Sequence, residues 1–545
     1  DSMYVRTKEK PFELFNSGNH NLKGVLILTP NGLKANGVFQ WDKGRLDSEL
    51  MSFGAFSVDA DTSNLQIFAF GSEDLAFDTR NVKTFLDFDK QEGRIKANSS
   101  ELSTTMPYNE YQTSMNEFIW NMKEEHITFL TEEGKYGSFR SIHPDQDSLT
   151  FQGKSAFYDL TTNLLQIGGV PVINTCDAYI YTKDGNVEIQ KGAVMTTLDS
   201  VRIVADTANK YHVINRATVN IYGKKHYKAK GYYEYNIGDK KQEIVFNDII
   251  GTRVGKGKRS EKKTVTRATG EAKPEDKFYI DHKTEFRGKI QLNAENKKLD
   301  FDGFARMDAP MLPAREWFSV KFKGDKKDLA ITFDQPKNYR SDPLRNGLFL
   351  SKATAKMYPR IMQPLNLRKD RPILETKGLF KYNKVRDEFI LGDSLKIVDN
   401  VRQGNQMTFS NKTGKINLEG KFNIGSGLNY VSITAAGAAK TAYSDTTSTN
   451  LDDAKFDVLA DMMAGVELII PDKLMKIMMT DIKSSSFDAK VIDYTKNQQF
   501  YEKALSELIP SVKDYNKTVE GMINLGLDLP SKHDPYTIFF SNLPM

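Results

Sequence analysis

Apolar and polar residues alternate with a period of two over most of this chain, up to about residue 440. In the segment 415–424, apolar residues fall on one face and lysine, asparagine and glutamate on the other. Successive side chains of a strand point to opposite faces, so this pattern is typical of a strand that is buried on one side. The same alternation occurs in 187–189, 217–221, 290–292 and 299–301. The chain is therefore predicted to be mainly antiparallel β structure.

A hairpin pattern repeats along the chain: an outgoing strand, a polar turn containing Asp or Asn, and a return strand that ends at or near glycine. Residues 151–168 have a close counterpart in 286–303 and a looser one in 377–392, and a fourth copy begins at Lys230. Each copy has a glycine near its start. The distances in sequence between these glycines are unequal, which disfavours a strict solenoid or propeller. We expect tandem antiparallel hairpins in sandwich, jelly-roll or elongated folded-sheet modules. The four glycines are Gly153, Gly231, Gly288 and Gly378.

The length of 545 residues predicts three or four folding units. A short helix is expected near 108–122, where Tyr111, Met115, Phe118 and Met122 have nearly helical spacing. A helical tail is expected near 497–522. The predicted units are a β module with the short helix (1–130), a second β module (131–251), a basic linker or loop (252–277), a third β module (278–450) and a methionine-rich β/α segment with the helical tail (451–545).

The basic segment 252–277 accounts for the net charge of the chain. It carries nine lysines or arginines and four acidic residues, and its net charge of +5 equals that of all 545 residues. The remainder is close to neutral, which disfavours nucleic acid as a partner. Because the segment lacks apolar alternation, we interpret it as a solvated linker or loop, with contact to nucleic acid or anionic head groups as the alternative.

Searches for catalytic motifs give almost nothing. The seven histidines are never paired at helical spacing, the single cysteine is Cys176, and no Gly-x-Ser-x-Gly motif occurs. Glycoside hydrolysis needs two carboxylates at a defined distance in space. The sequence does not show which of the 71 acidic residues lie at such a distance. We therefore predict no enzyme activity, no catalytic residue, no cofactor and no metal ion. Four acidic residues lie near aromatic or turn residues, and turn closure is a simpler role for them than catalysis. They are Asp177, Asp184, Asp308 and Glu316.

Two further segments have two interpretations each. The segment 307–318 places two prolines and a tryptophan between strands, and we interpret it as an ordered loop between sheets. Its alternative role is a recognition loop carried by Arg315, Trp317 and Phe318. The methionine-rich segment 462–479 suits core packing, or a groove for a partner or lipid.

Residues 149–247 resemble the OstA-like (organic-solvent-tolerance) β-jelly-roll modules of lipopolysaccharide transport proteins. The resemblance is carried by the hairpin 151–168, the segment 169–173, the strand and turn 177–185 and the strand 187–193. The whole chain is also similar to large, hairpin-rich envelope proteins of Bacteroidetes. This resemblance implies jelly-roll modules, an open V-shaped groove, and a place in the bacterial cell envelope, in the periplasm or at the outer membrane. It implies no catalytic or ligand residue.

The resulting prediction is a non-enzymatic envelope scaffold that binds or conducts an amphipathic ligand, a lipid or lipopolysaccharide, along an apolar β groove. Sequence alone leaves open whether the apolar faces line such a groove or a closed core. No apolar stretch reaches the roughly 20 residues of a membrane-spanning helix, so no transmembrane helix is predicted. The residues predicted to line the groove are Val219, Ile221, Ile416, Leu418, Phe422 and Ile424.

Two other functions stay open. One is a carbohydrate-binding or carbohydrate-active β sandwich, which needs an exposed aromatic platform such as Trp41, Trp120 or Trp317. The other is a component of a secretion or outer-membrane assembly that recruits other envelope proteins through unpaired sheet edges.

Overall fold

The computed structural model describes residues 2–69, 71, 74–99, 104–131, 134–255, 263–324, 330–401, 403–425, 428–429, 431–443, 456–468, 473, 477 and 536–541. The chain is mainly β, with antiparallel sheets, as the alternation predicted. It divides into two compact units. The first consists of Asp1–Tyr235, Glu243–Gly270 and Gln291–Lys297, and the second of Asn236–Gln242, Glu271–Ile290 and Lys298–Met545.

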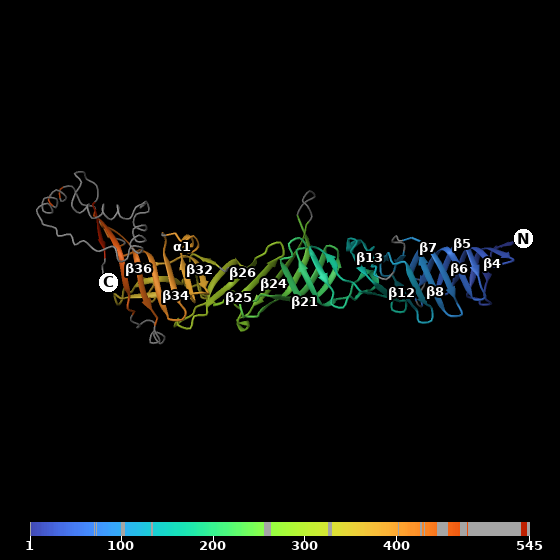
Figure 1. Ribbon diagram of the computed structural model, residues 1–545, viewed down its shortest axis with the longest axis horizontal. Coiled ribbons are helices and arrows are strands. Elements are labelled where there is room, and N and C mark those ends of the chain that lie inside the picture. The colour runs from blue at the N-terminus through green and yellow to red at the C-terminus, as the bar shows by residue number, and fades with distance from the viewer. Residues whose placement is uncertain are drawn as a thin grey trace. The chain divides into compact units, whose positions relative to one another are not determined.

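The first unit is built from antiparallel strands along which the chain advances from the N-terminus, although strands consecutive in the sequence are not always paired (Figure 1). Its elements are β1 (Met3–Arg6), β2 (Phe12–Glu13), β3 (Asn21–Thr29), β4 (Gly32–Trp41), β5 (Gly44–Phe53), β6 (Ser57–Phe68), β7 (Leu75–Asp87), β8 (Glu92–Ala97), β9 (Thr104–Met106), β10 (Tyr111–Thr113), β11 (Glu117–Asn121), β12 (His126–Leu130), β13 (Gly137–Ser141), η1 (Pro144–Gln146), β14 (Thr150–Gly153), β15 (Ser155–Asp159), β16 (Leu164–Gly168), β17 (Ile173–Thr175), β18 (Ala178–Tyr181), β19 (Val187–Ile189), η2 (Lys191–Ala193), β20 (Leu198–Ala205), β21 (His212–Gly223), β22 (His226–Glu234), β23 (Glu243–Val254) and most of β24 (Lys263–Ala272).

Strands β8 to β19 form two walls that the chain visits alternately. Wall A is the ladder β8–β11–β12–β15–β16–β19, and wall B is the ladder β9–β10–β13–β14–β17–β18. The chain crosses between the walls at a corner, for example through the single residue Lys154 between β14 and β15. From β9 to β18, each visit to a wall is a hairpin, because a period-2 segment interrupted by turn residues pairs with its neighbour first.

The longer strands β3 to β7 and β20 to β23 bend at the corner, where each short strand of β8 to β19 ends or begins. Strand β7 pairs with β8 of wall A through residues 82–87, and with β9 of wall B through Asp78 and Thr79. Between these two parts the register shifts, and Asn81 takes a left-handed conformation with φ 53°. Similar register shifts interrupt the pairing of β5, β6, β20, β21 and β23. A β-bulge bends its strand, so these bulges turn the long strands that contain them from one wall into the other.

The inward faces of the two walls meet in one apolar interior. In wall A, Phe118 and Trp120 of β11 are buried, while Ile119 between them remains 37% exposed. The Phe118 ring lies 5.3 Å from that of Phe77, which lies in the wall B part of β7. The Trp120 ring lies 6.1 Å from that of Trp41, at the end of β4. Long and short strands therefore share the same packed core.

The second unit contains an eight-stranded and a three-stranded antiparallel sheet. The first has the order β28-β32-β33-β34-β35-β36-β37-β38, and the second the order β30-β29-β31. The elements of this unit are η3 (Pro274–Asp276), most of β25 (Thr284–Asn293), β26 (Leu299–Met307), β27 (Phe318–Gly324), β28 (Ile331–Phe333), β29 (Arg345–Leu350), β30 (Met357–Gln363), β31 (Arg371–Glu375), β32 (Gly378–Asn383), β33 (Glu388–Gly392), α1 (Ser394–Val398), β34 (Gln406–Ser410), β35 (Lys415–Phe422), β36 (Val431–Ala442), β37 (Leu459–Leu468) and β38 (Tyr536–Ser541).

The helix predicted near 108–122 is wrong. Strands β10 and β11 occupy this segment, and both pair on two sides. Phe118, Trp120 and Met122 follow a period of two, and all three are buried. The turn 107–110 and the corner 114–116 interrupt the strands, and these interruptions produced a spacing that imitates a helix. The only α-helix among the described elements is α1, where the Asp393 side chain accepts a hydrogen bond from the Leu395 amide.

The basic segment 252–277 is a hairpin rather than a linker over its described part. Thr252 to Val254 in β23 pair with Val265 to Lys263 in β24. Val265 and Ala268 are buried, so β24 contributes to the interior despite the high charge of its surroundings. Residues 256–262, which hold four of the nine basic residues that suggested a linker, lie outside the described residues, as do the helical tail predicted at 497–522 and half of the methionine-rich segment 462–479.

Candidate functional site

The residues predicted to line a groove lie in two different units. Val219 and Ile221 belong to β21 of the first unit, whereas Ile416, Leu418 and Phe422 belong to β35 of the second. All five point inward, with 0–4% of their surface exposed. Ile424 follows the end of β35 and is half-buried. At the five strand positions the apolar faces are packed against other side chains and present almost no surface to water.

The predicted recognition loop packs its residues in different ways. Phe318 is fully buried, and its ring lies 5.6 Å from that of Phe380. Trp317 is half-buried, with the guanidinium groups of Arg287 and Arg306 over its ring at 4.4 and 4.5 Å from the centroid. Arg315 is exposed and lies 3.7 Å from a carboxylate oxygen of Asp308. Cation–π contacts and ion pairs therefore hold Trp317 and Arg315 in place.

Charged side chains gather around this loop within the second unit. The Arg306 guanidinium binds the Glu285 carboxylate, and Lys283 lies 3.5 Å from Asp308. The Lys240 Nζ lies over the Tyr279 ring, 2.9 Å from its centroid, and burial lowers the pKa of Lys240. Burial, together with nearby Asp308 and Glu285, raises the pKa of Tyr279 to about 12. The acidic side chains are already paired with cations, which favours a structural role for the cluster.

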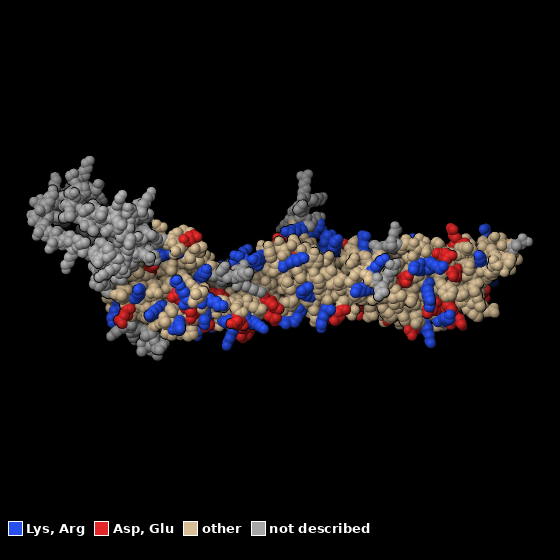
Figure 2. Space-filling model, in the orientation of Figure 1, with Lys and Arg blue, Asp and Glu red and all other residues tan. Residues whose placement is uncertain are grey.

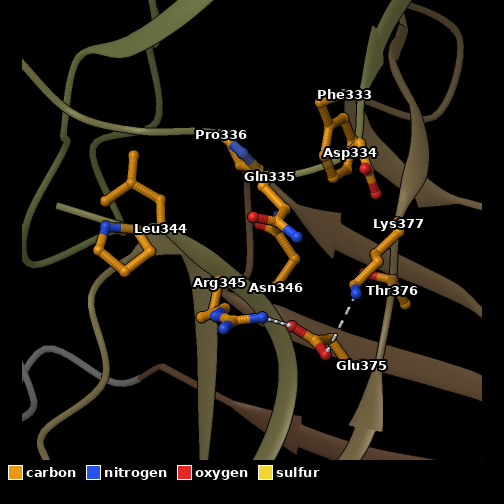
Figure 3. Close-up of a pocket in the computed structure, with 11 residues that line it drawn as sticks. Phe333, Asp334, Gln335, Pro336, Leu344, Arg345, Asn346, Glu375, Thr376 and Lys377 are labelled. Atoms are coloured by element: carbon orange, nitrogen blue, oxygen red, sulfur yellow. Dashed lines mark hydrogen bonds and ion pairs between the residues drawn. The ribbon is translucent and has the colours of Figure 1, made fainter. Parts of the chain in front are cut away.

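A small space lies elsewhere in the second unit, between β29, β31 and the segment 333–336 (Figure 3). Glu375 accepts a hydrogen bond of 2.7 Å from Arg345, and Lys377 lies 3.9 Å from its other oxygen. The Oγ1 atom of Thr376 is buried there without a hydrogen-bond partner in the described structure. The space has a volume of about 20 Å³, which is on the order of what one water molecule needs. It is too small for an organic ligand.

In the first unit, hydrogen bonds join the two walls along the rim opposite the corner. Asn109, in the turn between β9 and β10 of wall B, is fully buried and donates from Nδ2 to the carbonyls of Asn163 and Ile189, both at 2.9 Å. These carbonyls belong to wall A. The Gly192 amide donates to the Tyr108 carbonyl at 3.1 Å. We call this set of contacts the rim clasp, and it closes the interior on this side.

The chain itself crosses the rim at the clasp. Residues 190–197 lead from β19 of wall A to β20, which pairs with β18 of wall B. Gln146, in the turn between β13 and β14, donates from Nε2 to the Ala193 carbonyl at 2.5 Å. Its Oε1 accepts a hydrogen bond of 3.2 Å from the Tyr111 hydroxyl. A buried, doubly bonded glutamine thereby fixes the crossing segment against wall B.

A cavity of about 600 Å³ lies on the rim where this crossing segment meets the β13–β14 turn and the end of β21. We call it the rim cavity. Apolar side chains of Val194, Met195 and Ile221 line one part of it, and mostly neutral polar side chains line the rest. Asp145 is its one formally charged lining residue among the described residues. Of the residues predicted to line a groove, the rim cavity includes Ile221 alone.

An exposed aromatic ring stands at the border of the rim cavity. Tyr222 is 50% exposed, and its ring is stacked on that of His226 with centroids 5.1 Å apart. The His226 ring is held in turn by a contact of 3.1 Å between its Nδ1 and the Gly251 carbonyl. Beside Tyr222, the Thr197 hydroxyl donates to Oδ1 of Asn220 at 2.6 Å. These contacts fix the orientation of both Tyr222 and Asn220.

Sequence reasoning missed the rim clasp and the rim cavity. Asn109, Gln146 and Tyr222 stand in or beside turns, where polar residues are common in any β protein. The only available signal was the absence of strand alternation in 190–197. The tryptophans named as a carbohydrate platform do not form one, because Trp41 and Trp120 are buried and Trp317 is covered by arginines.

The described residues contain no helix that is long and apolar enough to cross a membrane. They also bring together no set of three or more histidine, cysteine or acidic side chains that could hold a metal ion. Acidic and basic side chains are interspersed on the face shown in Figure 2. Comparison with known proteins finds no family model that matches this sequence and no matching curated protein.

Proposed function

We propose that the first unit is an envelope scaffold that holds the apolar part of an amphipathic ligand, a lipid or lipopolysaccharide, between its two walls. The observation that carries this proposal is the shared apolar interior. Facing walls supply a continuous series of inward aromatic and aliphatic side chains, from Trp41 through Trp120 to Phe118 and Phe77. Separation of the walls at the rim would break the hydrogen bonds of Asn109 and Gly192 in the rim clasp but would leave both ladders paired.

The resemblance of residues 149–247 to OstA-like modules supports the proposal, because this segment contributes strands to both walls. It supports a location in the bacterial envelope as well. The packed state of the interior sets a condition on ligand entry. An acyl chain enters only when the walls move apart at the rim, and the apolar surface that it covers then offsets the contacts that are lost.

The test is uptake of cis-parinaric acid, a fluorescent fatty acid, by the delipidated full chain. Two variants carry the photo-crosslinking residue benzoylphenylalanine, one in place of the inward Val219 and one in place of Tyr232, which is 37% exposed on the outer face of β22. We expect saturable uptake and light-dependent lipid attachment at position 219 but not at 232. Absence of uptake, or equal attachment at both positions, contradicts the proposal and leaves a scaffold without a ligand.

A further inference from the structure

We propose that the rim cavity is a binding site for an uncharged sugar, separate from the interior between the walls. Its volume of about 600 Å³ lies within the range of small-molecule sites, roughly 300–1,000 Å³. Its composition follows the general plan of such sites, with an apolar part and a few polar groups that fix orientation. The site is built entirely from the first unit.

The electrostatics of the rim cavity select against anions. Among the described residues, neither lysine nor arginine lines it, and Asp145 contributes a carboxylate. A phosphate or carboxylate ligand would give up its hydration without gaining a cation in return. An uncharged ligand avoids this cost, because neutral amides and hydroxyls can replace its hydrogen bonds to water.

The polar groups of the rim cavity suit a ligand that carries several hydroxyls. Asn220 accepts a hydrogen bond from Thr197 through Oδ1, which leaves its Nδ2 as a donor. Gln190 and Thr196 add an amide and a hydroxyl that can each donate and accept. His143 accepts a hydrogen bond from the Asp145 amide at Nδ1, so the proton of the neutral ring is on Nε2. Sugar hydroxyls, which both donate and accept, match this mixture.

The Tyr222 ring supplies the remaining requirement, a flat apolar surface for the C–H face of a sugar ring. It is 50% exposed, and its stacking on His226 means that little side-chain freedom is lost on binding. Val194 is also exposed at the same site, at 53%. An exposed and immobilised tyrosine next to an exposed valine is a surface that a ligand can cover at low entropic cost.

The experiment is ligand-observed saturation-transfer NMR on the full chain. The probes are the methyl glycosides of glucose, galactose, mannose and N-acetylglucosamine, with methyl glucuronide as the anionic counterpart of glucose. We expect at least one neutral glycoside to bind saturably with a dissociation constant on the order of 1 mM, and glucuronide at least about fivefold more weakly than glucose. Tyr222→Ala should weaken binding by about fivefold to tenfold, because it removes the ring.

Matched variants separate loss of the site from loss of the fold. Tyr222→Phe keeps the ring and should retain binding within about twofold. Tyr211→Ala removes a similarly exposed tyrosine (43%) outside the rim cavity and should change nothing. Failure of all neutral glycosides to bind, equal binding of glucuronide and glucose, or full binding by Tyr222→Ala overturns the proposal. Uptake of cis-parinaric acid by the same variants tests the proposed function separately, and Tyr222→Ala is expected to retain it.

Discussion

Two regions of the first unit build the same folded sheet in different ways. In β3 to β7, long strands run through the corner and bend there at bulges and glycines. In β8 to β19, the chain stops at the corner and starts a new short strand in the other wall. Both regions contribute to one interior, as the contact between Trp41 and Trp120 shows. The sheet can therefore turn the corner in two ways: one long strand bends there, or one short strand ends and the next begins. The same core packs behind both kinds of corner.

The difference lies in which residues the corner tolerates. In the bent region, Gly24 and Gly37 face each other across β3 and β4, and a Cβ atom on Gly37 would lie 2.8 Å from the Gly24 Cα. Gly37 also has φ 133°, which other residues avoid. In the cut region the corner residue Lys154 is exposed, and its backbone amide donates to the Gly168 carbonyl at 2.8 Å. At these two positions, the bent corner depends on glycine, whereas the cut corner depends on a backbone hydrogen bond.

The largest effect should come from the shared interior. Trp120→Ala removes a fully buried ring and should lower the free energy of unfolding by about 3–5 kcal/mol. Because the core is common, hydrogen exchange followed by mass spectrometry should show faster exchange in β4 and β5 as well as in β11 and β12. The neighbouring change Ile119→Ala, on the outer face, should cost less than about 1 kcal/mol. Protection retained in β4 and β5 of the Trp120 variant would mean that the two regions fold independently.

The next effect separates the two kinds of corner. Gly37→Ala should destabilise the first unit by about 2–4 kcal/mol, since it adds backbone strain and a steric clash in the bent region. Lys154→Gln, at a cut corner, should change stability by less than about 0.5 kcal/mol. Urea unfolding of both variants measures the contrast. Similar stabilities for the two would refute the distinction between bent and cut corners.

The rim offers a third comparison of the same regions. Asn109→Ala removes the two hydrogen bonds that a buried donor makes to carbonyls of wall A, so it should cost about 1–3 kcal/mol. In the bent region, Lys43 in the β4–β5 turn donates to the Met122 carbonyl and pairs with Glu125. Its side chain is 40% exposed, so Lys43→Gln should cost less than about 1 kcal/mol. Thermal unfolding of the pair measures the difference, and a larger loss in the Lys43 variant would contradict it.

The smallest effect depends on pH. Asp177, in the β17–β18 turn, accepts a hydrogen bond of 2.9 Å from the Thr266 amide of β24. Burial raises the pKa of Asp177, so the folded chain holds this proton more tightly than the unfolded chain. Its contribution to stability therefore decreases as the pH rises from the ordinary carboxyl pKa through the raised one, and is constant above it.

The Asp177→Asn variant removes this titration. The difference in free energy of unfolding, wild type minus Asp177→Asn, should fall with rising pH across that window. Urea unfolding of both chains at a series of acidic pH values measures it. A difference that rises with pH would mean that Thr266 lowers the pKa of Asp177 more than burial raises it.

Much of the local structure could be predicted from the sequence. Alternation is a property of neighbouring residues, and it identified strands such as β19, β26 and β35 and the mainly β class. The repeated glycines mark positions where no side chain fits: a Cβ on Gly288 would lie 2.6 Å from the Gly303 Cα, and one on Gly378 2.7 Å from the Gly392 carbonyl oxygen. The helix expected at 108–122 failed because a turn and a corner inside a strand region shifted the period.

The sequence by itself determined which face of each strand is apolar and where the chain turns, since both follow from residues close together in the chain. Only the tertiary structure decided which strands share a wall, where the sheet folds, and that Asn109 meets Asn163 and Ile189. The rim cavity likewise needs the segments 143–146, 190–197 and 220–222. Pairings across such separations depend on register and packing along the entire fold, which a period of two does not encode.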